Sequence, residues 1–253
     1  MAELTVHHRR LLDNMATLMD DGNYSDFVIS CQGRHFNVHK AIMCSASPIL
    51  AAAFNMNMAE SQTGVFEHTE YDADTVERMI SYVYKTEYDL PQDVQVLVSA
   101  PASADADEDN STVSIPGPNA QLIAHTRMYA IGSYYQLPTL GLIALQNFAS
   151  CTKARFETTG FIHVLREVDT HIRKDDRDFR DAVRTLALDN LIPPTQDNSF
   201  MIDLAEVGDV QEFAAEMLRQ VVQDRTRERE DCAGQERRHM DQIASLDARC
   251  TII

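Results

Sequence analysis

The spacing of apolar residues near the N-terminus predicts a helix over residues 9–20. Its apolar positions recur at intervals of three and four residues, which places them on one stripe: Leu11, Leu12, Met15, Leu18 and Met19. The polar stretch DGNYS follows directly and ends the helix, because Gly and Asn favour turns.

Alternation of apolar and polar residues then predicts two short strands, DFVISC and HFNVH, joined by the turn QGR. The side-chain period of a strand is two, so Phe27, Ile29 and Cys31 share one face of the first strand. Residues 40–45 fit a short helix. Ser47 before Pro48 has the form of a helix N-cap followed by proline at the first helical position, so a second helix begins there.

The stretch GVFEHTEYD predicts a third strand, and a strongly amphipathic helix comes after it. Asp74 with Glu77 three residues later resembles a capping box, in which both side chains satisfy backbone N–H groups at a helix start. The apolar residues beyond it repeat with helical spacing: Val76, Met79, Ile80, Val83 and Tyr84.

Helical patterns dominate the rest of the chain. They return at AQLIAHTRMYAIGSYYQ and, after Leu137-Pro138, at TLGLIALQNFAS. Two amphipathic stripes follow, from Phe161 to Ile172 and from Phe179 to Leu186, and a last strong helix covers Val210 to Val221. We therefore predict an all-helical C-terminal extension over residues 151–253.

A change of composition interrupts the pattern at residues 99–119. The stretch SAPASADADEDNSTVSIPGPN is rich in Ser, Ala, Pro and acidic residues and has almost no core-forming side chains. Such a segment buries too little apolar surface to offset the entropy of ordering it, so we predict a disordered acidic insertion.

Charge excludes several classes of partner. The net charge of −17 over 253 residues opposes binding to nucleic acid, which requires clustered Lys and Arg. It also opposes attraction to an anionic membrane surface. Acidity of this degree favours solubility and partners with basic patches.

The cysteines indicate a reducing compartment. They number five, and none forms a C-x-x-C pair, which argues against a structural metal site and against a secreted disulfide framework. No apolar run approaches the length of a membrane span, and the N-terminus lacks the apolar region of a signal peptide. The expected location is the cytoplasm, the nucleus or both, and nothing in the sequence points to a cofactor.

Three blocks together resemble the BTB/POZ domain family. They are GNYSDFVISCQGRHFNVHKAIMCSASPILAAAF, ESQTGVFEHTEYDADTVERMISYVYKTEYD and MYAIGSYYQLPTLGLIALQNF, and they extend from about Leu11 to about Ser150. The pattern is similar to the stand-alone BTB proteins of filamentous fungi. The resemblance implies an α+β BTB/POZ fold over residues 1–150, with a small mixed sheet flanked by helices. The acidic insertion departs from the family pattern.

The resemblance also assigns roles near the first strand pair. Asp26, His39 and Lys40 match a family motif and are expected to be structural, with His39 hydrogen-bonded where it docks the first helix pair. A rival interpretation is nucleophilic catalysis by Cys44 or Ser45 with His39 as base. No nucleophile-elbow motif supports that chemistry, so we expect no enzyme activity.

Two kinds of protein partner follow from the resemblance. The first is a second copy of the chain, since family members often dimerise through the first helix, which here carries the stripe from Leu11 to Met19. Packing of that stripe on its own subunit explains the pattern equally well. The second is cullin-3, because members that bind it carry an apolar residue, any residue and Glu before the third strand. Met58 and Glu60 fit that motif, although a solvated loop would also account for them.

These features lead to two functional hypotheses. One is a substrate-recruiting adaptor for a cullin-3 ubiquitin ligase, with an unidentified protein substrate. The other is a homo-oligomerisation scaffold in transcriptional or signalling complexes that binds no cullin. Neither Kelch repeats nor zinc fingers accompany the BTB-like blocks, so a recognition surface must come from the helical C-terminal part.

The last four residues have the C-a-a-X form of a prenylation signal, in which Cys250 would carry the lipid. Ile is not among the usual final residues of that signal. The preceding segment is mixed in charge and lacks the polybasic patch that stable anchoring requires. We therefore expect the protein to stay off membranes, with Cys250 as its candidate modification site.

Overall fold

The structure is a computed structural model that describes residues 2–55, 63–90, 94–99, 112–154 and 160–191, together with Gly234 and Arg238. The chain divides into two compact units, Met1–Phe200 and Met201–Ile253. The description below concerns the first unit. Met58, Glu60 and Cys250 lie outside the described residues, as does the helix predicted from Val210 to Val221.

A three-stranded mixed sheet forms the centre of the N-terminal half. Strands β1 (Phe27–Cys31) and β2 (Arg34–Val38) pair antiparallel, and β3 (Val65–His68) pairs parallel with β1 on its other edge, giving the order β2-β1-β3. The predicted alternation holds, because Phe27, Ile29 and Cys31 are all buried on one face. Helix α1 (Ala2–Asp21) precedes the sheet and is longer than the sequence pattern predicted.

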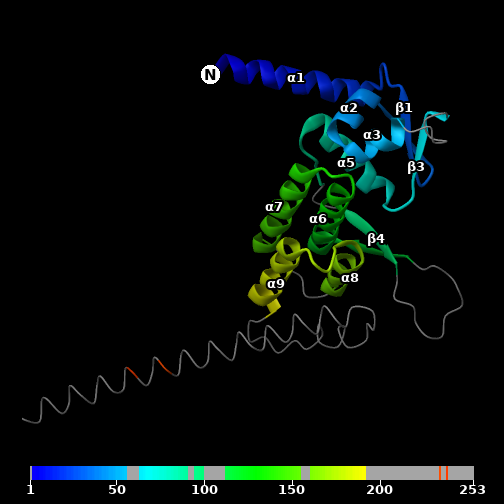
Figure 1. Ribbon diagram of the computed structural model, residues 1–253. Helices are drawn as coiled ribbons and strands as arrows, with labels where there is room; N and C mark the ends of the chain where they lie inside the picture. The colour runs from blue at the N-terminus through cyan, green and yellow to red at the C-terminus, as the bar shows by residue number, and fades with distance from the viewer. Residues whose placement is uncertain are drawn as a thin grey trace, which may run out of the picture. The chain divides into compact units, whose positions relative to one another are not determined.

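Helices α2 (Lys40–Ala46), α3 (Pro48–Asn55) and α5 (Ala73–Lys85) complete the core around that sheet (Figure 1). Ser47 caps α3 as predicted, since its Oγ accepts the Leu50 N–H at 3.1 Å. The same hydroxyl donates to the Tyr135 carbonyl at 2.7 Å and so joins the start of α3 to the turn that follows Tyr134.

The predicted capping box at Asp74 and Glu77 is wrong. Helix α5 begins two residues earlier, with Asp72 as its N-cap, and the Asp72 carboxylate accepts the Thr75 N–H at 2.9 Å. Asp74 and Glu77 instead both pair with Arg34 of β2. Because both carboxylates pair with Arg34, Asp72 rather than Asp74 accepts a backbone N–H of the first turn of α5, which has no partner within the helix.

The predicted disorder at residues 99–119 is contradicted at its C-terminal end. Strand β5 (Thr112–Pro116) pairs antiparallel with β4 (Gln95–Ser99), and helix α6 (Gly117–Tyr134) starts immediately afterwards. The alternating apolar positions of this ribbon explain it: Val96, Val98 and Ile115 are buried. The intervening residues 100–111 lie outside the description.

Helices α6, α7 (Pro138–Ala154), α8 (Phe161–His171) and α9 (Arg177–Leu191) follow as the sequence predicted (Figure 1). The turn at Leu137-Pro138 lets α6 and α7 pack closely. A Cβ atom on Gly132 would lie 3.2 Å from the Gly141 backbone nitrogen, so a larger residue at this crossing would have to push the two helices slightly apart. The stripes of α8 and α9 are buried, with Phe161, Val164 and Phe179 all at 0% exposure.

Candidate functional site

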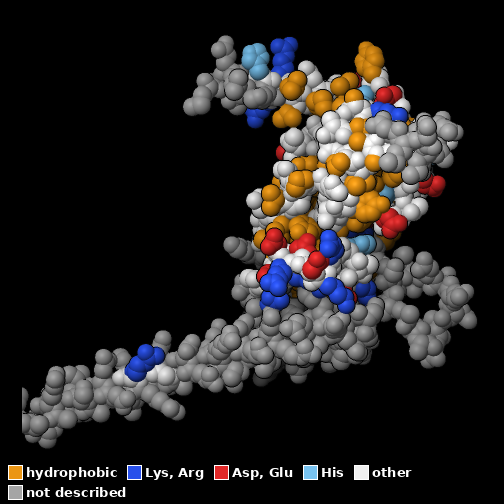
Figure 2. Space-filling view, viewed as in Figure 1, with side chains coloured by type: hydrophobic (Ala, Val, Ile, Leu, Met, Phe, Trp, Pro, Cys, Tyr) orange, Lys and Arg blue, Asp and Glu red, His pale blue; other side chains and the backbone are white. Residues whose placement is uncertain are grey.

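The apolar stripe of α1 is partly packed against its own subunit and partly exposed to solvent. Met15 and Met19 pack against the core, and Leu18 is half-buried. Leu11 and Leu12 are 62% and 38% exposed, and Figure 2 shows apolar side chains on the surface of this helix. The C-terminal half of α1 is therefore anchored to its own subunit, while the half around Leu11 has apolar side chains that the described part of the chain does not cover.

The three residues of the family motif lie together where β2 meets α2. The Asp26 carboxylate accepts the Lys40 backbone N–H at 2.7 Å, which holds the start of α2 against the start of β1. Lys40 Nζ lies 5.2 Å from the centre of the Phe27 ring, in a cation–π contact. His39 is buried, and its ring contacts the ring of Tyr84 on α5.

Both ring nitrogens of His39 are engaged. Nε2 lies 2.7 Å from the Asn23 carbonyl oxygen, which can only accept, so this nitrogen carries the proton. Nδ1 lies 2.8 Å from the Tyr84 hydroxyl, and the same hydroxyl oxygen accepts the His39 backbone N–H at 2.8 Å. Tyr84 was not identified from the sequence as a partner of His39.

This geometry does not support the nucleophilic alternative. Ser45 Oγ donates to the Ile42 carbonyl at 2.8 Å. Burial raises the pKa of the Cys44 thiol, the opposite of what an activated nucleophile needs. Among the described residues no hydrogen bond joins His39 to either side chain, because both of its nitrogens are engaged elsewhere.

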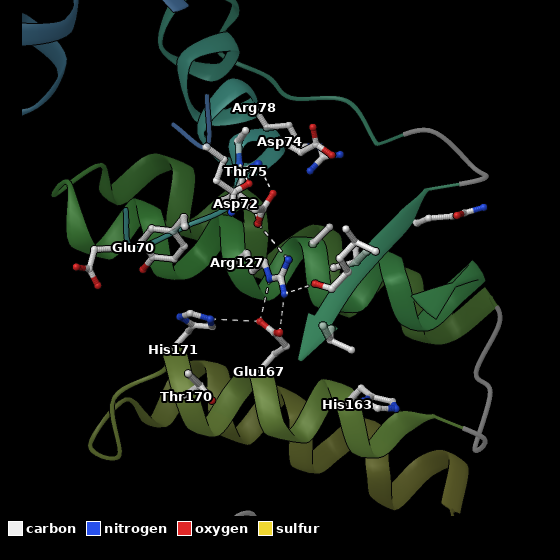
Figure 3. A pocket seen from close by; sticks show the side chains of 18 of the residues that line it. Glu70, Asp72, Asp74, Thr75, Arg78, Arg127, His163, Glu167, Thr170 and His171 are labelled. Carbon is white, nitrogen blue, oxygen red and sulfur yellow. Dashed lines mark hydrogen bonds and ion pairs between the residues drawn. The ribbon is translucent and has the colours of Figure 1, made fainter. Parts of the chain in front are cut away.

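A polar cavity of about 590 Å³ opens between the first turn of α5, strand β4, helix α6 and helix α8 (Figure 3). Its lining brings together charged residues from segments distant in the sequence: Glu70, Asp72, Asp74, Arg34, Arg78, Arg127, Arg166, Glu167, His163 and His171. We call this the polar cavity.

Arg127 of α6 is the central residue of the polar cavity (Figure 3). Its Nε and Nη2 donate to the two oxygens of Glu167 on α8, at 2.9 and 2.6 Å. Nη1 donates to Asp72 at 3.1 Å, and Nη2 also donates to the Leu97 carbonyl of β4 at 3.1 Å. One guanidinium therefore joins the start of α5, the ribbon strand β4 and helix α8.

Burial makes these ion pairs strong and costly to disturb. The side chains of Arg127 and Glu167 are 12% and 11% exposed. Burial raises the pKa of Glu167, but hydrogen bonds from His171 and Arg127 and their charges outweigh it and lower that pKa to about 2. The pKa of Asp72 is likewise raised by burial, and Arg127 with the Thr75 hydrogen bonds lowers it below its usual range. Both acids are ionised at neutral pH.

The sequence contained one signal for this cavity. Arg127 is the only Asp, Glu, Lys or Arg residue in AQLIAHTRMYAIGSYYQ, and a lone arginine in a helix that buries most of its surface needs a buried partner. The identity of that partner could not be predicted, because Asp72 and Glu167 lie 55 and 40 residues away.

Within the described ranges, no three His, Cys, Asp or Glu side chains are grouped as a metal site. Over the same ranges, none of the helices combines the length and apolar character needed to cross a bilayer.

Residues 15–103 match the family model of the BTB/POZ domain. Kelch-like protein 40 of Xenopus laevis is 28% identical over 91 residues, which is 36% of this chain and 15% of that protein. Kelch-like protein 26 of Danio rerio is 31% identical over 87 residues, which is 34% of this chain and 14% of that protein. This chain thus matches only a small part of these curated relatives.

Two solved structures are also similar. The BTB domain of zebrafish PATZ1 has 12% identity and a TM-score of 0.39, covering 56% of this chain and 91% of that one. The BTB domain of human gigaxonin has 16% identity and a TM-score of 0.37, covering 55% and 89%. Residues 15–103 are a BTB/POZ domain, in an α+β fold with a small mixed sheet and a helical region after it.

Proposed function

We propose that this BTB/POZ protein is an adaptor that recruits a protein substrate to a cullin-3 ubiquitin ligase. The observation that carries the proposal is the position of Met58-Ala59-Glu60. This motif lies inside the matched range 15–103, in the segment between the end of α3 and the start of β3. The BTB/POZ domain is a protein-interaction domain and typically has no catalytic role, so recruitment rather than chemistry is its proposed activity.

The chemistry of the motif suits a docking contact. An apolar side chain such as Met58 can fill a pocket on a partner, and Glu60 can add a polar contact at its rim. A few anchors of this kind contribute most of the free energy of a protein interface. Met is well suited to the anchor role because its thioether side chain adapts to irregular pockets.

Self-association is the second part of the proposal. Leu11 and Leu12 are exposed on α1, while Met15 and Met19 hold the same helix to its own core. We propose that the exposed part of this stripe packs against a second copy of the chain to form a homodimer. A dimeric adaptor would present two substrates or two cullins at once, which increases avidity.

The alternative function is a homo-oligomerisation scaffold in transcriptional or signalling complexes that binds no cullin. The exposed leucines of α1 favour it as much as they favour the adaptor, since both need the dimer. In either case we assign residues 1–150 to the BTB/POZ domain and residues 151–253 to a helical extension, in the cytoplasm or the nucleus. The stand-alone, fungal-type architecture remains part of this proposal.

A pull-down with purified cullin-3 tests the adaptor function. The wild type should retain cullin-3, and the double variant Met58→Asp with Glu60→Lys should retain at least tenfold less. Loss of about 2 kcal/mol at an interface anchor has that effect on binding. Light scattering should show the same oligomeric mass for both proteins. A wild type that binds no cullin-3 would eliminate the adaptor in favour of the scaffold, and equal binding by both proteins would eliminate the motif.

A further inference from the structure

Two buried histidines join helix α6 and the turn after it to the rest of the domain. His125 of α6 is 5% exposed, and its Nδ1 lies 2.8 Å from the hydroxyl of Tyr88, which follows α5. His68, at the end of β3, is 3% exposed, and its Nδ1 lies 2.8 Å from the hydroxyl of Tyr135, the residue after α6. The two pairs join residues that are 37 and 67 positions apart in the chain, so both hold distant segments together.

The surroundings of His125 favour the neutral imidazole. Burial removes the water that would solvate a charge, the positive charge of Arg78 on α5 repels a second cation, and together they lower the pKa of His125 to about 4. The other titratable groups beside this pair are Tyr88 itself and Cys151 of α7. Burial raises the pKa of both, to about 12 for Tyr88, so both are uncharged at neutral pH. Among the described residues, no carboxylate pairs with His125 to offset a positive charge on it.

His68 is enclosed by aromatic rings and has one unsatisfied nitrogen. Its ring stacks on that of Tyr71, with the ring centres 5.6 Å apart and the planes 1° apart. Nε2 is buried, and no group in the described part of the chain forms a hydrogen bond with it. Protonation would therefore place a charge and an N–H donor where neither is solvated. Burial lowers the pKa of His68, and the negative charge of Glu70 acts in the opposite direction. The titratable groups around the ring are three tyrosines, one cysteine of the adjacent strand and one exposed carboxylate: Tyr71, Tyr134, Tyr135, Cys31 and Glu70.

We propose that His68 and His125 form a pH-sensitive switch, in which two neutral imidazoles hold α6 and its following turn in place and proton uptake opens the fold. Helix α6 cannot separate alone, because Met128 and Ile131 share one hydrophobic core with Phe27 of β1. The imidazoles therefore reach water only when the core opens, which couples protonation to unfolding.

The direction of this coupling follows from the two lowered pKa values. Below the ordinary histidine pKa of 6.5 the unfolded chain binds more protons than the folded chain does. The stability is therefore complete above pH 6.5 and is lost as the pH falls from 6.5 toward 4, the pH range that His125 sets. This switch goes beyond the proposed function, since it confines whatever partner the domain binds to neutral conditions.

Urea unfolding of the full chain at pH 7 and pH 5.5, followed by circular dichroism at one fixed protein concentration, measures the coupling. A fall of the His125 pKa from 6.5 to about 4 on folding predicts that the unfolding equilibrium constant rises about eightfold between these pH values. His68 adds to that rise. The pKa of Glu167 falls from 4.5 to about 2 on folding, so its contribution changes little in this range.

Three substitutions by asparagine assign the rise to the two buried histidines. An asparagine amide can bond to a tyrosine hydroxyl as Nδ1 does, but it takes up no proton in this pH range. His125→Asn should remove about eightfold from the rise, and His68→Asn should remove a further part of it. His35→Asn makes the same change at an exposed histidine of β2 and should leave the rise unaltered.

Nitrogen-15 NMR of the wild type, labelled at histidine, reports the protonation states even if the variants do not fold. In the folded protein at pH 5.5, the His68 and His125 signals should be those of neutral imidazoles. An ordinary histidine, with a pKa of about 6.5, is about nine-tenths protonated at that pH.

Two results would overturn the proposal. One is protonated signals from both histidines in the folded protein at pH 5.5. The other is a double variant, His68→Asn with His125→Asn, that is folded at pH 7 and keeps the full wild-type rise. None of these measurements contains cullin-3, so a failure here leaves the adaptor function standing, and a failure of the cullin pull-down leaves this switch standing.

Discussion

Helices α1 and α8 carry similar amphipathic stripes but are buried to very different extents. In α8 the apolar residues Phe161, Val164 and Leu165 are all at 0% exposure. In α1 the residues at the free end of the stripe, Leu11 and Leu12, are 62% and 38% exposed. An apolar stripe therefore predicts that one face of a helix packs against another surface, but it does not predict whether that surface belongs to the same chain.

The ion pair that holds α8 is also more buried than the ion pair that holds α1. Helix α8 is joined to α6 through the Arg127–Glu167 pair, whose side chains are 12% and 11% exposed. Helix α1 is joined to α5 through Lys85 and Asp20, at 3.0 Å and with side chains 31% and 60% exposed. Exposed ion pairs contribute little, whereas removal of one partner from a buried pair is costly. We infer that α8 is fixed to the domain and that α1 is the helix free to contact a second copy.

The largest predicted effect follows from removing the buried cation. Arg127→Met should lower the free energy of unfolding by about 3–5 kcal/mol, because Asp72 and Glu167 would be left buried without a counter-charge. Urea unfolding followed by circular dichroism measures it. Arg184→Met is the matched control, since Arg184 pairs with the exposed Asp181 on α9 and should cost less than about 1 kcal/mol. Equal losses in the two variants would contradict the difference between buried and exposed pairs.

The second prediction is that the free energy of unfolding depends on pH through Glu167. Its pKa falls from 4.5 to about 2 on folding, so its ionised form stabilises the folded state above pH 4.5. That contribution is lost as the pH falls from 4.5 toward 2. Glu167→Gln should therefore cost about 2 kcal/mol at pH 7 and progressively less below pH 4.5, as measured by urea unfolding at each pH. If the two proteins differed in unfolding free energy by the same amount from pH 7 to pH 3, ionisation of Glu167 would not be the source of the stabilisation.

The smallest effect on stability is predicted for α1, where the expected change is in assembly. Leu11→Asp with Leu12→Asp should change the free energy of unfolding by less than about 0.5 kcal/mol, because surface substitutions usually do. The same variant should convert a dimer into a monomer in light scattering, since two charges would enter the apolar contact. Leu142→Asp, at a leucine of α7 that is 60% exposed, should keep the dimeric mass. A variant of α1 that unfolds would show that this stripe packs on its own chain.

Local patterns predicted most of the elements. The alternation at Phe27, Ile29 and Cys31 gave the buried face of β1, and Ser47 before Pro48 located the start of α3. These predictions held because each depends on neighbours within a few residues. The ribbon of β4 and β5 was missed, because composition across residues 99–119 concealed a short alternation that only strand pairing stabilises.

The sequence by itself determined which segments are amphipathic, where α3 is capped, and that residues 15–103 form a BTB/POZ domain. Tertiary structure alone decided the cap of α5, because Arg34 of β2 draws Asp74 and Glu77 away from the helix start. It also decided that Arg127 meets Asp72 and Glu167, residues that lie far from it in the chain. The physical reason is the same in each case. An ionised side chain must be neutralised where it is buried, and the residue that does so is set by the packing of distant segments rather than by sequence neighbours.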